Sequence, residues 1–310
     1  MRIRSNHWIN RQRDMVNGVQ SCELDLTVGI KKDQIRLVIA SGMITSELGL
    51  IEIPHLIAPA GLEELSNSVK VVYDPKVIDL GVPVYFIRGI RNDFGSSATL
   101  DNIMKVDFLR GEEVQCIGIL SEYKPKLPVN IVVLSSHTKI IHIGRSGKVL
   151  SCMTTMSGQI YEALKTATNV GSSLIHVEGE PESGVAENDI VNLACESVEN
   201  TGFTRAVLVP RFMQVLLNTS CRERTLFIDA VITTEDIKAL IEFENQGFLT
   251  DNYILFGPEG RQKLYKQLFE RYVSRNVDFL CVSDPQRISD LTVLGATVIA
   301  NQFIKKTDIE

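Results

Sequence analysis

Closely spaced cysteine pairs are absent from this chain of 310 residues, although six cysteines are present. Zinc knuckles and dithiol redox sites need cysteines a short, fixed distance apart, so neither is predicted. The cysteines lie instead in apolar runs such as 114–117 and 279–282. We therefore expect Cys116 and Cys281 to be reduced thiols that fill core positions.

An excess of basic residues is also missing, since 32 Lys and Arg stand against 38 Asp and Glu and the net charge is −6. A surface for binding nucleic acid is therefore not expected. The basic residues near the start have no apolar run behind them, and no segment approaches the length of a membrane span. We expect a protein of the cytoplasm that has no membrane partner.

Hydrophobic residues make up 44% of the chain, which is enough for a substantial core. The length exceeds that of one compact domain, so two domains are predicted. Pro125 and Pro128 interrupt the chain within a short stretch. We place the boundary there, with a first domain over residues 1–126 and a second over 127–310.

Apolar patterns differ on the two sides of this boundary. Before it, the runs at 35–40 and 82–87 predict buried strands and residues 114–120 predict a helix. After it, strands at 130–134, 139–143 and 148–153 are joined by turn-forming residues and predict an antiparallel meander. Further elements are then expected, namely helices at 157–165, 187–199, 211–219, 222–243 and 261–273 and strands at 253–256 and 277–282. Such an order is typical of an α/β fold with a mixed sheet.

The first turn of the meander is dense in small hydroxyl residues. Its backbone amides, from Ser135 to Thr138, can cradle phosphate oxygens, and Lys139 can add a positive charge. Ordinary hairpin turns share this composition, and the turn alone favours that simpler interpretation.

Two carboxylates, Glu112 and Glu113, stand at the predicted start of a helix. The helix dipole favours acidic residues there, so on these residues alone capping is the favoured interpretation. In the functional alternative, Arg110 grips a substrate carboxylate or phosphate with its planar fork. One of the glutamates then takes a proton from a hydroxyl, an effect of about 10²–10⁴ in rate.

Polar side chains also follow the strand at 35–40, in the stretch 41–49 that includes Ser46 and Glu47. Ligands of open α/β sheets bind at the carboxyl ends of strands, where this stretch would lie. Gly257 occupies a similar turn after the strand at 253–256, and a glycine lets a nucleotide come close to the backbone. Each turn is a weak signal because such turns are common.

Taken in order, these segments resemble the 2-dehydro-3-deoxygalactonokinase family. The stretches that carry the resemblance are 39–49, 54–59, 109–115, 136–139 and 154–158, together with the Gly257 turn. The Arg-Gly-Glu-Glu and His-Thr-Lys blocks are the most specific. The resemblance implies an α/β, two-lobed actin-like ATPase (ribonuclease H-like) fold with nucleotide between the lobes. It also implies transfer of a phosphoryl group from ATP, with Mg²⁺, to the 6-hydroxyl of 2-dehydro-3-deoxy-D-galactonate in D-galactonate catabolism.

The resemblance, together with the residue chemistry, gives the expected roles. Arg110 binds the substrate carboxylate or orients the phosphoryl group, and Glu112 or Glu113 is the base. Ser46 and Glu47 bind substrate hydroxyls. Gly257 is expected near the adenosine, and the ATP phosphates are expected at Ser136, His137, Thr138 and Lys139. A homodimer is the commonest oligomeric outcome for such a chain.

Folds of this kind open with a phosphate-binding hairpin that contains an Asp-x-Gly-Thr turn. Residues 1–13 contain no glycine, so the first lobe is expected to be incomplete at its N-terminus. Loss of the metal-organising Asp would severely impair phosphoryl transfer. The alternatives are therefore a truncated or decayed kinase that binds the sugar acid without catalysis, and a kinase for a related 2-keto-3-deoxy sugar acid.

Overall fold

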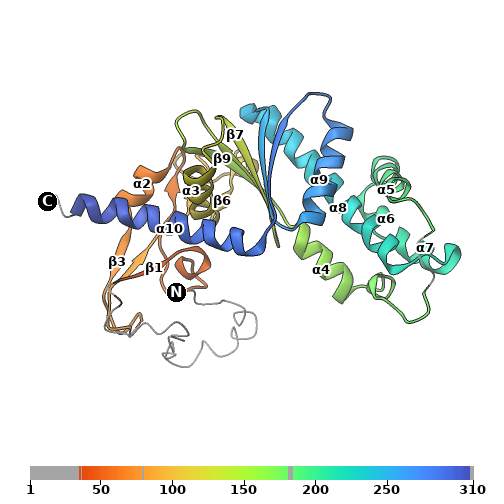
Figure 1. Ribbon diagram of the computed structural model, residues 1–310, viewed down its shortest axis with the longest axis horizontal. Coiled ribbons are helices and arrows are strands. Elements are labelled where there is room, and N and C mark those ends of the chain that lie inside the picture. The colour runs from red at the N-terminus through yellow and green to blue at the C-terminus, as the bar shows by residue number, and fades with distance from the viewer. Residues whose placement is uncertain (1–34, 36, 79, 181–183, 308–310) are drawn as a thin grey trace.

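The computed structural model describes residues 35, 37–78, 80–180 and 184–307. The expected absence of an N-terminal hairpin falls on residues outside these ranges. Within these ranges the strands form one five-stranded sheet and two three-stranded sheets. Figure 1 shows the larger sheet in the middle of the molecule with helices on both of its sides.

The five-stranded sheet contains the predicted meander. Its antiparallel strands are β7 (Val129–Leu134), β8 (Thr138–Ile143) and β9 (Val149–Thr155). Two further strands, β10 (Asn252–Phe256) and β11 (Asp278–Val282), run parallel to β7 and complete the order β11-β10-β7-β8-β9. The prediction of a mixed sheet is confirmed.

Both faces of this sheet are covered, and β7 is buried along its whole length. Side chains of a strand alternate between faces. Val132 and Leu134 accordingly pack in one core and Ile131 and Val133 in the other. The first core is covered by α5 (Glu187–Thr201), α8 (Cys221–Phe243) and α9 (Glu259–Tyr272), and the second by α3 (Glu112–Tyr123) and α10 (Pro285–Thr307).

The two smaller sheets belong to the N-terminal part of the chain. One has the order β1-β4-β3 and the other β2-β5-β6. The strands at 35–40 and 82–87 were predicted and correspond to β1 and β4. The elements here are β1 (Val38–Ala40), η2 (Gly42–Thr45), β2 (Leu56–Ile57), α2 (Leu62–Asn67), β3 (Lys70–Val72), β4 (Val84–Phe86), β5 (Ile90–Arg91), η3 (Ile103–Lys105) and β6 (Phe108–Leu109).

The helix α10 returns the chain to this N-terminal part, along α3 (Figure 1). The two helix backbones touch at a pair of glycines. A Cβ atom added to Gly118 would lie 1.9 Å from the carbonyl oxygen of Leu291, and one added to Gly295 would lie 1.9 Å from that of Val114. The division between residues 126 and 127 stays a prediction. The helix α10 belongs to the predicted second domain but packs against α3 and α2 of the predicted first domain.

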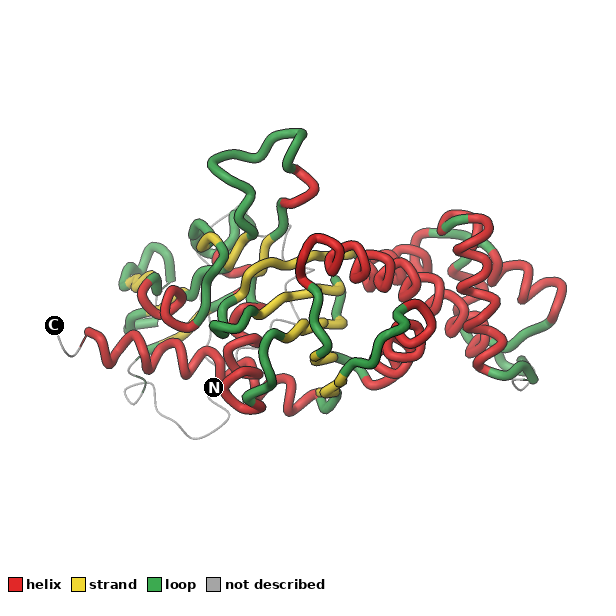
Figure 2. Tube along the Cα trace, turned by 90° about the horizontal axis from the view of Figure 1, so that it is seen from above, coloured by secondary structure: helices red, strands yellow, loops and turns green. Residues whose placement is uncertain are grey.

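A helical region occupies one end of the molecule, where the described residues form no strand (Figure 2). Its buried Arg224 is 1% exposed and donates to the Ser173 carbonyl and to Glu180, each at 2.5 Å. The remaining elements, most of them in this region, are α4 (Ser157–Ala167), η4 (Gly171–Leu174), α6 (Phe203–Ala206), α7 (Val209–Leu217) and, after α8, η5 (Glu244–Phe248).

Three of the five described cysteines follow the prediction of buried thiols; Cys221 is only half-buried, and Cys22 lies outside the described residues. Cys116, Cys152 and Cys195 are buried and free, whereas Cys281 is exposed. The prediction for Cys281 was wrong because β11 is the edge strand of the sheet, where its side chain is left uncovered. Among the described residues, no helix is long and apolar enough to cross a membrane.

Candidate functional site

Gly42 and Gly111 bring two of the predicted blocks together. A Cβ atom on Gly111 would lie 3.3 Å from the Cα atom of Gly42. The φ angles are 86° and 115°, values at which a side chain causes strain. The stretch 41–49 and the block 110–113 are therefore neighbours at the start of α3.

The guanidinium of Arg110 binds groups of the protein itself. Its Nη1 donates to the carbonyl and, at 2.8 Å, to the hydroxyl of Thr45, and it reaches the Ile53 carbonyl at 3.4 Å. Its Nη2 lies 3.3 Å from Nδ1 of His55. These contacts tie the segment 45–55 to the start of α3. Substrate binding by Arg110 remains a prediction.

Ser46 and Glu47 lie in this segment in different environments. Ser46 is buried, and its hydroxyl donates to the Met43 carbonyl at 2.7 Å and accepts from the Leu48 amide at 3.2 Å. Glu47 is exposed. Ser46 therefore shapes the turn, and the carboxylate of Glu47 is open to a ligand.

The two glutamates both cap the start of α3. Glu112 accepts a hydrogen bond from the Arg110 amide at 3.0 Å, and both oxygens of Glu113 accept from the Gly111 amide, at 2.9 and 2.7 Å. Glu113 is 1% exposed, and burial, followed by the charge of Glu112, raises the pKa of Glu113 to about 8. Glu112 is only half-buried, so it is the glutamate that a ligand can reach.

His55 stands beside Arg110 in a neutral form. Burial, then the charges of Arg110 and Arg91, lower the pKa of His55 to about 4. A guanidinium can only donate, so Nδ1 of His55 accepts and the proton lies on Nε2. That Nε2 is buried and has no partner within the described residues.

The 135–139 turn is joined to this cluster by side chains that cross between the sheets. Lys139 Nζ donates to the Phe108 carbonyl at 2.9 Å and to Thr154 Oγ1 at 3.0 Å. The amide and hydroxyl of Thr154 donate to Asp107, at 2.6 and 2.7 Å. Asn92 adds bonds to the amide and carbonyl of Cys152, at 2.8 and 2.9 Å. The 110–113 block and the 135–139 turn therefore lie at one junction.

Two helix N-termini approach the turn itself. A Cβ atom on Gly158, in the first turn of α4, would lie 2.6 Å from the Ser135 carbonyl oxygen. One on Gly257, just before α9, would lie 2.5 Å from the Leu134 carbonyl oxygen. Helix N-termini favour anions, so this arrangement suits a phosphate.

Asp236 of α8 also faces this turn, and the sequence reasoning missed it. Its carboxylate accepts from the hydroxyls of Thr138 at 2.8 Å and Thr155 at 2.5 Å, and from that of Ser157. Burial raises the pKa of Asp236, and the hydroxyl bonds oppose that rise. The available signal was a charged residue on the apolar stripe of α8, one turn from both Ile232 and Leu240.

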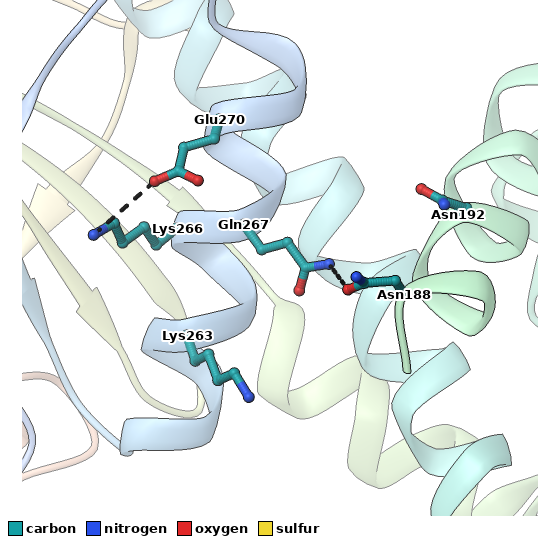
Figure 3. Close-up of a pocket in the computed structure, with 6 residues that line it drawn as sticks. All are labelled: Asn188, Asn192, Lys263, Lys266, Gln267 and Glu270. Atoms are coloured by element: carbon teal, nitrogen blue, oxygen red, sulfur yellow. Dashed lines mark hydrogen bonds and ion pairs between the residues drawn. The ribbon is translucent and has the colours of Figure 1, made fainter. Parts of the chain in front are cut away.

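A polar groove lies apart from these groups, between α5 and α9 (Figure 3). Gln267 donates to Asn188 across it at 3.1 Å, and Lys266 is 4.0 Å from Glu270. No predicted site residue lines it. Its lining residues are Asn188, Asn192, Lys263, Lys266, Gln267 and Glu270.

No set of three or more metal-ligating side chains comes together in the part of the chain that the structure describes. Of the nearby carboxylates, those of Asp107 and Asp236 already accept hydrogen bonds from hydroxyl groups. Residues that would hold Mg²⁺ are therefore not assigned.

Comparisons with known proteins agree with the predicted fold. A crystal structure from Sinorhizobium meliloti, described as a 2-dehydro-3-deoxygalactonokinase, matches with a TM-score of 0.62 and 19% identity, over 85% of this chain and 77% of that chain. Component A of (R)-2-hydroxyglutaryl-CoA dehydratase from Acidaminococcus fermentans matches at a TM-score of 0.38, 13% identity, 61% of this chain and 67% of that chain. The ADPNP-bound activator of 2-hydroxyisocaproyl-CoA dehydratase from Clostridium difficile matches at a TM-score of 0.35 and 12% identity, over 64% of this chain and 68% of that chain. The last two matches are too weak to carry an argument, and no curated protein matches.

The S. meliloti match confirms the prediction of an α/β, actin-like ATPase fold. A family model for 2-keto-3-deoxy-galactonokinases matches residues 15–279. That match includes both the 110–113 block and the 135–139 turn. The chain belongs to the 2-keto-3-deoxy-galactonokinase family.

Proposed function

We propose that this kinase transfers the terminal phosphoryl group of ATP to the 6-hydroxyl of 2-dehydro-3-deoxy-D-galactonate, in D-galactonate catabolism in the cytoplasm. The observation that carries the proposal is the junction of Lys139, Thr154 and Asp107. These contacts join the turn at residues 135–139, which we call the phosphate turn, to β6, the strand that leads into Arg110. A phosphoryl donor at the turn and an acceptor at the start of α3 would share one site.

The donor half consists of the turn and the helices that approach it. Phosphoryl transfer depends mainly on positioning and on neutralising charge. The N-termini of α4 and α9 and the guanidinium of Arg261, which donates to the Ser135 carbonyl at 2.7 Å, all place positive potential beside the turn. The ATP phosphates would bind at residues 136–139, with the adenosine near Gly257.

The acceptor half is electropositive, although the whole protein is acidic. Besides burial, the charges of Arg110, Arg91 and Lys139 lower the pKa of His55, and only the charge of Glu47 raises it. Three cations and one carboxylate therefore act on this point of the junction. A positive site of this kind favours a substrate that carries a carboxylate. The exposed Glu47 would then bind hydroxyl groups of the sugar acid.

Glu112 is our choice of base. A base must reach the hydroxyl whose proton it takes, and Glu113 is 1% exposed and bound twice to the Gly111 amide. Glu112 would accept the proton of the 6-hydroxyl while the hydroxyl oxygen bonds to the γ-phosphorus and ADP departs. Glu112→Gln should therefore lower turnover more than it weakens binding of the sugar acid.

The test is a coupled assay of ADP release with ATP, Mg²⁺ and the sugar acid, run beside calorimetric titration of the sugar acid alone. Saturable turnover that is faster with 2-dehydro-3-deoxygalactonate than with other 2-keto-3-deoxy sugar acids supports the proposal. Binding without turnover makes the chain a sugar-acid-binding protein. Absence of both binding and turnover rejects the assigned site.

A further inference from the structure

The buried carboxylate of Asp236 gathers three separate segments around the phosphate turn. Its partners are Thr138 at the start of β8, Thr155 at the end of β9 and Ser157 at the start of α4. Asp236 is 1% exposed and Thr138 is fully buried. A ligand therefore cannot contact this carboxylate directly. Asp236 can affect the site only through the three segments to which it is hydrogen-bonded.

These bonds determine which hydrogen-bond donors and acceptors of the three hydroxyls remain available to other groups. An ionised carboxylate only accepts hydrogen bonds. Asp236 therefore takes the hydrogen of the Thr138 hydroxyl. The hydroxyls of Thr155 and Ser157 lie 2.7 Å apart and share their hydrogens between Asp236 and each other. Thr138 Oγ1 in turn accepts from Arg261 Nη2 at 3.1 Å, while Nη1 of Arg261 donates to the Ser135 carbonyl at 2.7 Å. A continuous chain of hydrogen bonds therefore runs from Asp236 to the turn.

The carbonyl groups of the turn are all held by the protein. The Ser135 carbonyl accepts from Arg261, the Ser136 carbonyl from the Gln159 amide at 2.9 Å, and the His137 carbonyl from the Ser135 amide and hydroxyl at 3.3 and 3.0 Å. The amides of Ser136 and His137 have no partner in the residues that the structure describes. Successive unpaired amides in a turn are what an anion-binding nest requires.

We propose that Asp236 is a positioning residue for the nucleotide: it holds β8, β9 and α4 so that the amides of Ser136 and His137 face the phosphates. The inference rests on the proposed function, because it assumes that the turn binds the phosphates of ATP. Removing the carboxylate frees three hydroxyls, loosens Thr138 and Arg261, and lets the carbonyls of the turn rotate toward the ligand.

The variant is Asp236→Asn, which keeps the size of the side chain but weakens its acceptance of three donors. Asp229→Asn is the matched control. Asp229 lies on the same helix, and burial raises its pKa too, although the charge of Arg261 opposes that rise. Unlike that of Asp236, its carboxylate forms no hydrogen bond to the turn or to any other described residue. Misplacement of a binding group by about 1 Å can cost on the order of 10²-fold in rate. We expect Asp236→Asn to weaken ADP binding by about tenfold or more and Asp229→Asn to change it little.

Three readouts separate positioning from general damage. Calorimetry should show a raised Kd for ADP with an unchanged Kd for the sugar acid, and kinetics should show a raised KM for ATP. Amide hydrogen exchange should accelerate at residues 136–139 and 157–159 and not in α10. If Asp236→Asn does not fold, Thr155→Ala and Ser157→Ala each remove one of the three hydroxyls that bond Asp236 and should give smaller shifts of the same kind.

The outcomes separate this inference from the proposed function. Unchanged ADP affinity and unchanged exchange at the turn in a folded Asp236→Asn protein overturn the inference, as does equal weakening of ADP and sugar-acid binding. If the unmodified protein binds no nucleotide, the proposed function fails. Selective acceleration of exchange at the turn would still support the role of Asp236 in shaping it.

Discussion

Replacement of Gly118 by alanine tests the closest helix contact in the molecule. A Cβ atom there would lie 1.9 Å from the Leu291 carbonyl oxygen, whereas real Cβ contacts essentially never fall under 3.0 Å. The obstacle is a main-chain atom in the middle of α10, so it cannot rotate away as a flexible side chain would. The two helices must therefore move apart locally by roughly 1 Å, which opens the core that they share.

Two opposing effects set the size of the change. Alanine is better than glycine inside a helix by about 1 kcal/mol. Overpacking of a closed core costs about 1–3 kcal/mol, and sometimes more. With a main-chain carbonyl in the way we take the upper end of that range. The expected net loss is about 2 kcal/mol in the free energy of unfolding, which is about 3 °C in Tm for a chain of this size.

Urea unfolding followed by circular dichroism measures the loss. Gly260→Ala is the control, because a Cβ atom on Gly260 meets nothing within 4 Å. It should leave stability unchanged or raise it by up to about 1 kcal/mol. The double variant Gly118→Ala/Gly295→Ala should lose less than the sum of the single losses, because one separation of the helices relieves both clashes. A Gly118→Ala protein as stable as the unmodified one would refute the reasoning.

Two further predictions concern buried charges. The pKa of Glu113 is raised from 4.5 to about 8, so between these pH values the folded state keeps a proton that the unfolded state releases. The resulting contribution to stability is complete below about pH 4.5 and is lost as the pH rises to about 8. The slope of the free energy of unfolding is at most about 1.4 kcal/mol per pH unit. Urea unfolding between pH 5 and 8 should show this slope, and Glu113→Gln should flatten it; an equal slope in the variant contradicts the assignment. Arg224→Met leaves Glu180 without its buried partner and should cost about 3–5 kcal/mol in the free energy of unfolding, whereas Arg222→Ala, which removes an ion pair whose arginine is 76% exposed, should cost less than about 1 kcal/mol. Equal losses in these two variants would contradict the role given to burial.

The long elements of the fold could be predicted because each carries its own periodic pattern. The meander and the helices α5, α8 and α9 were predicted to within a few residues. Strands such as β2, β5 and β6 have two residues each, too few for any alternation to show. The helix α10 was not predicted; it begins at Pro285, and proline is well tolerated at the first position of a helix.

The site was only partly visible in the sequence. Resemblance to a family singled out the blocks around Arg110 and Lys139, and the structure brings these blocks together. Asp236 gave no such signal, because it is separated from Thr138, Thr155 and Ser157 by 98, 81 and 79 residues. A contact of this kind depends on the tertiary fold, so no local sequence pattern predicts it.

The return of α10 to α3 also has a consequence for the order in which the protein can fold on the ribosome. The surface of α3 around Gly118 is synthesised early, but the helix that covers it is the last described element. At about 5–20 residues per second, roughly ten seconds or more pass before Gly295 is made. During that interval the nascent N-terminal part exposes an unfinished apolar face. We therefore expect this chain to reach its native state only after synthesis has passed α10, and fragments that stop short of α10 to aggregate or to bind chaperones.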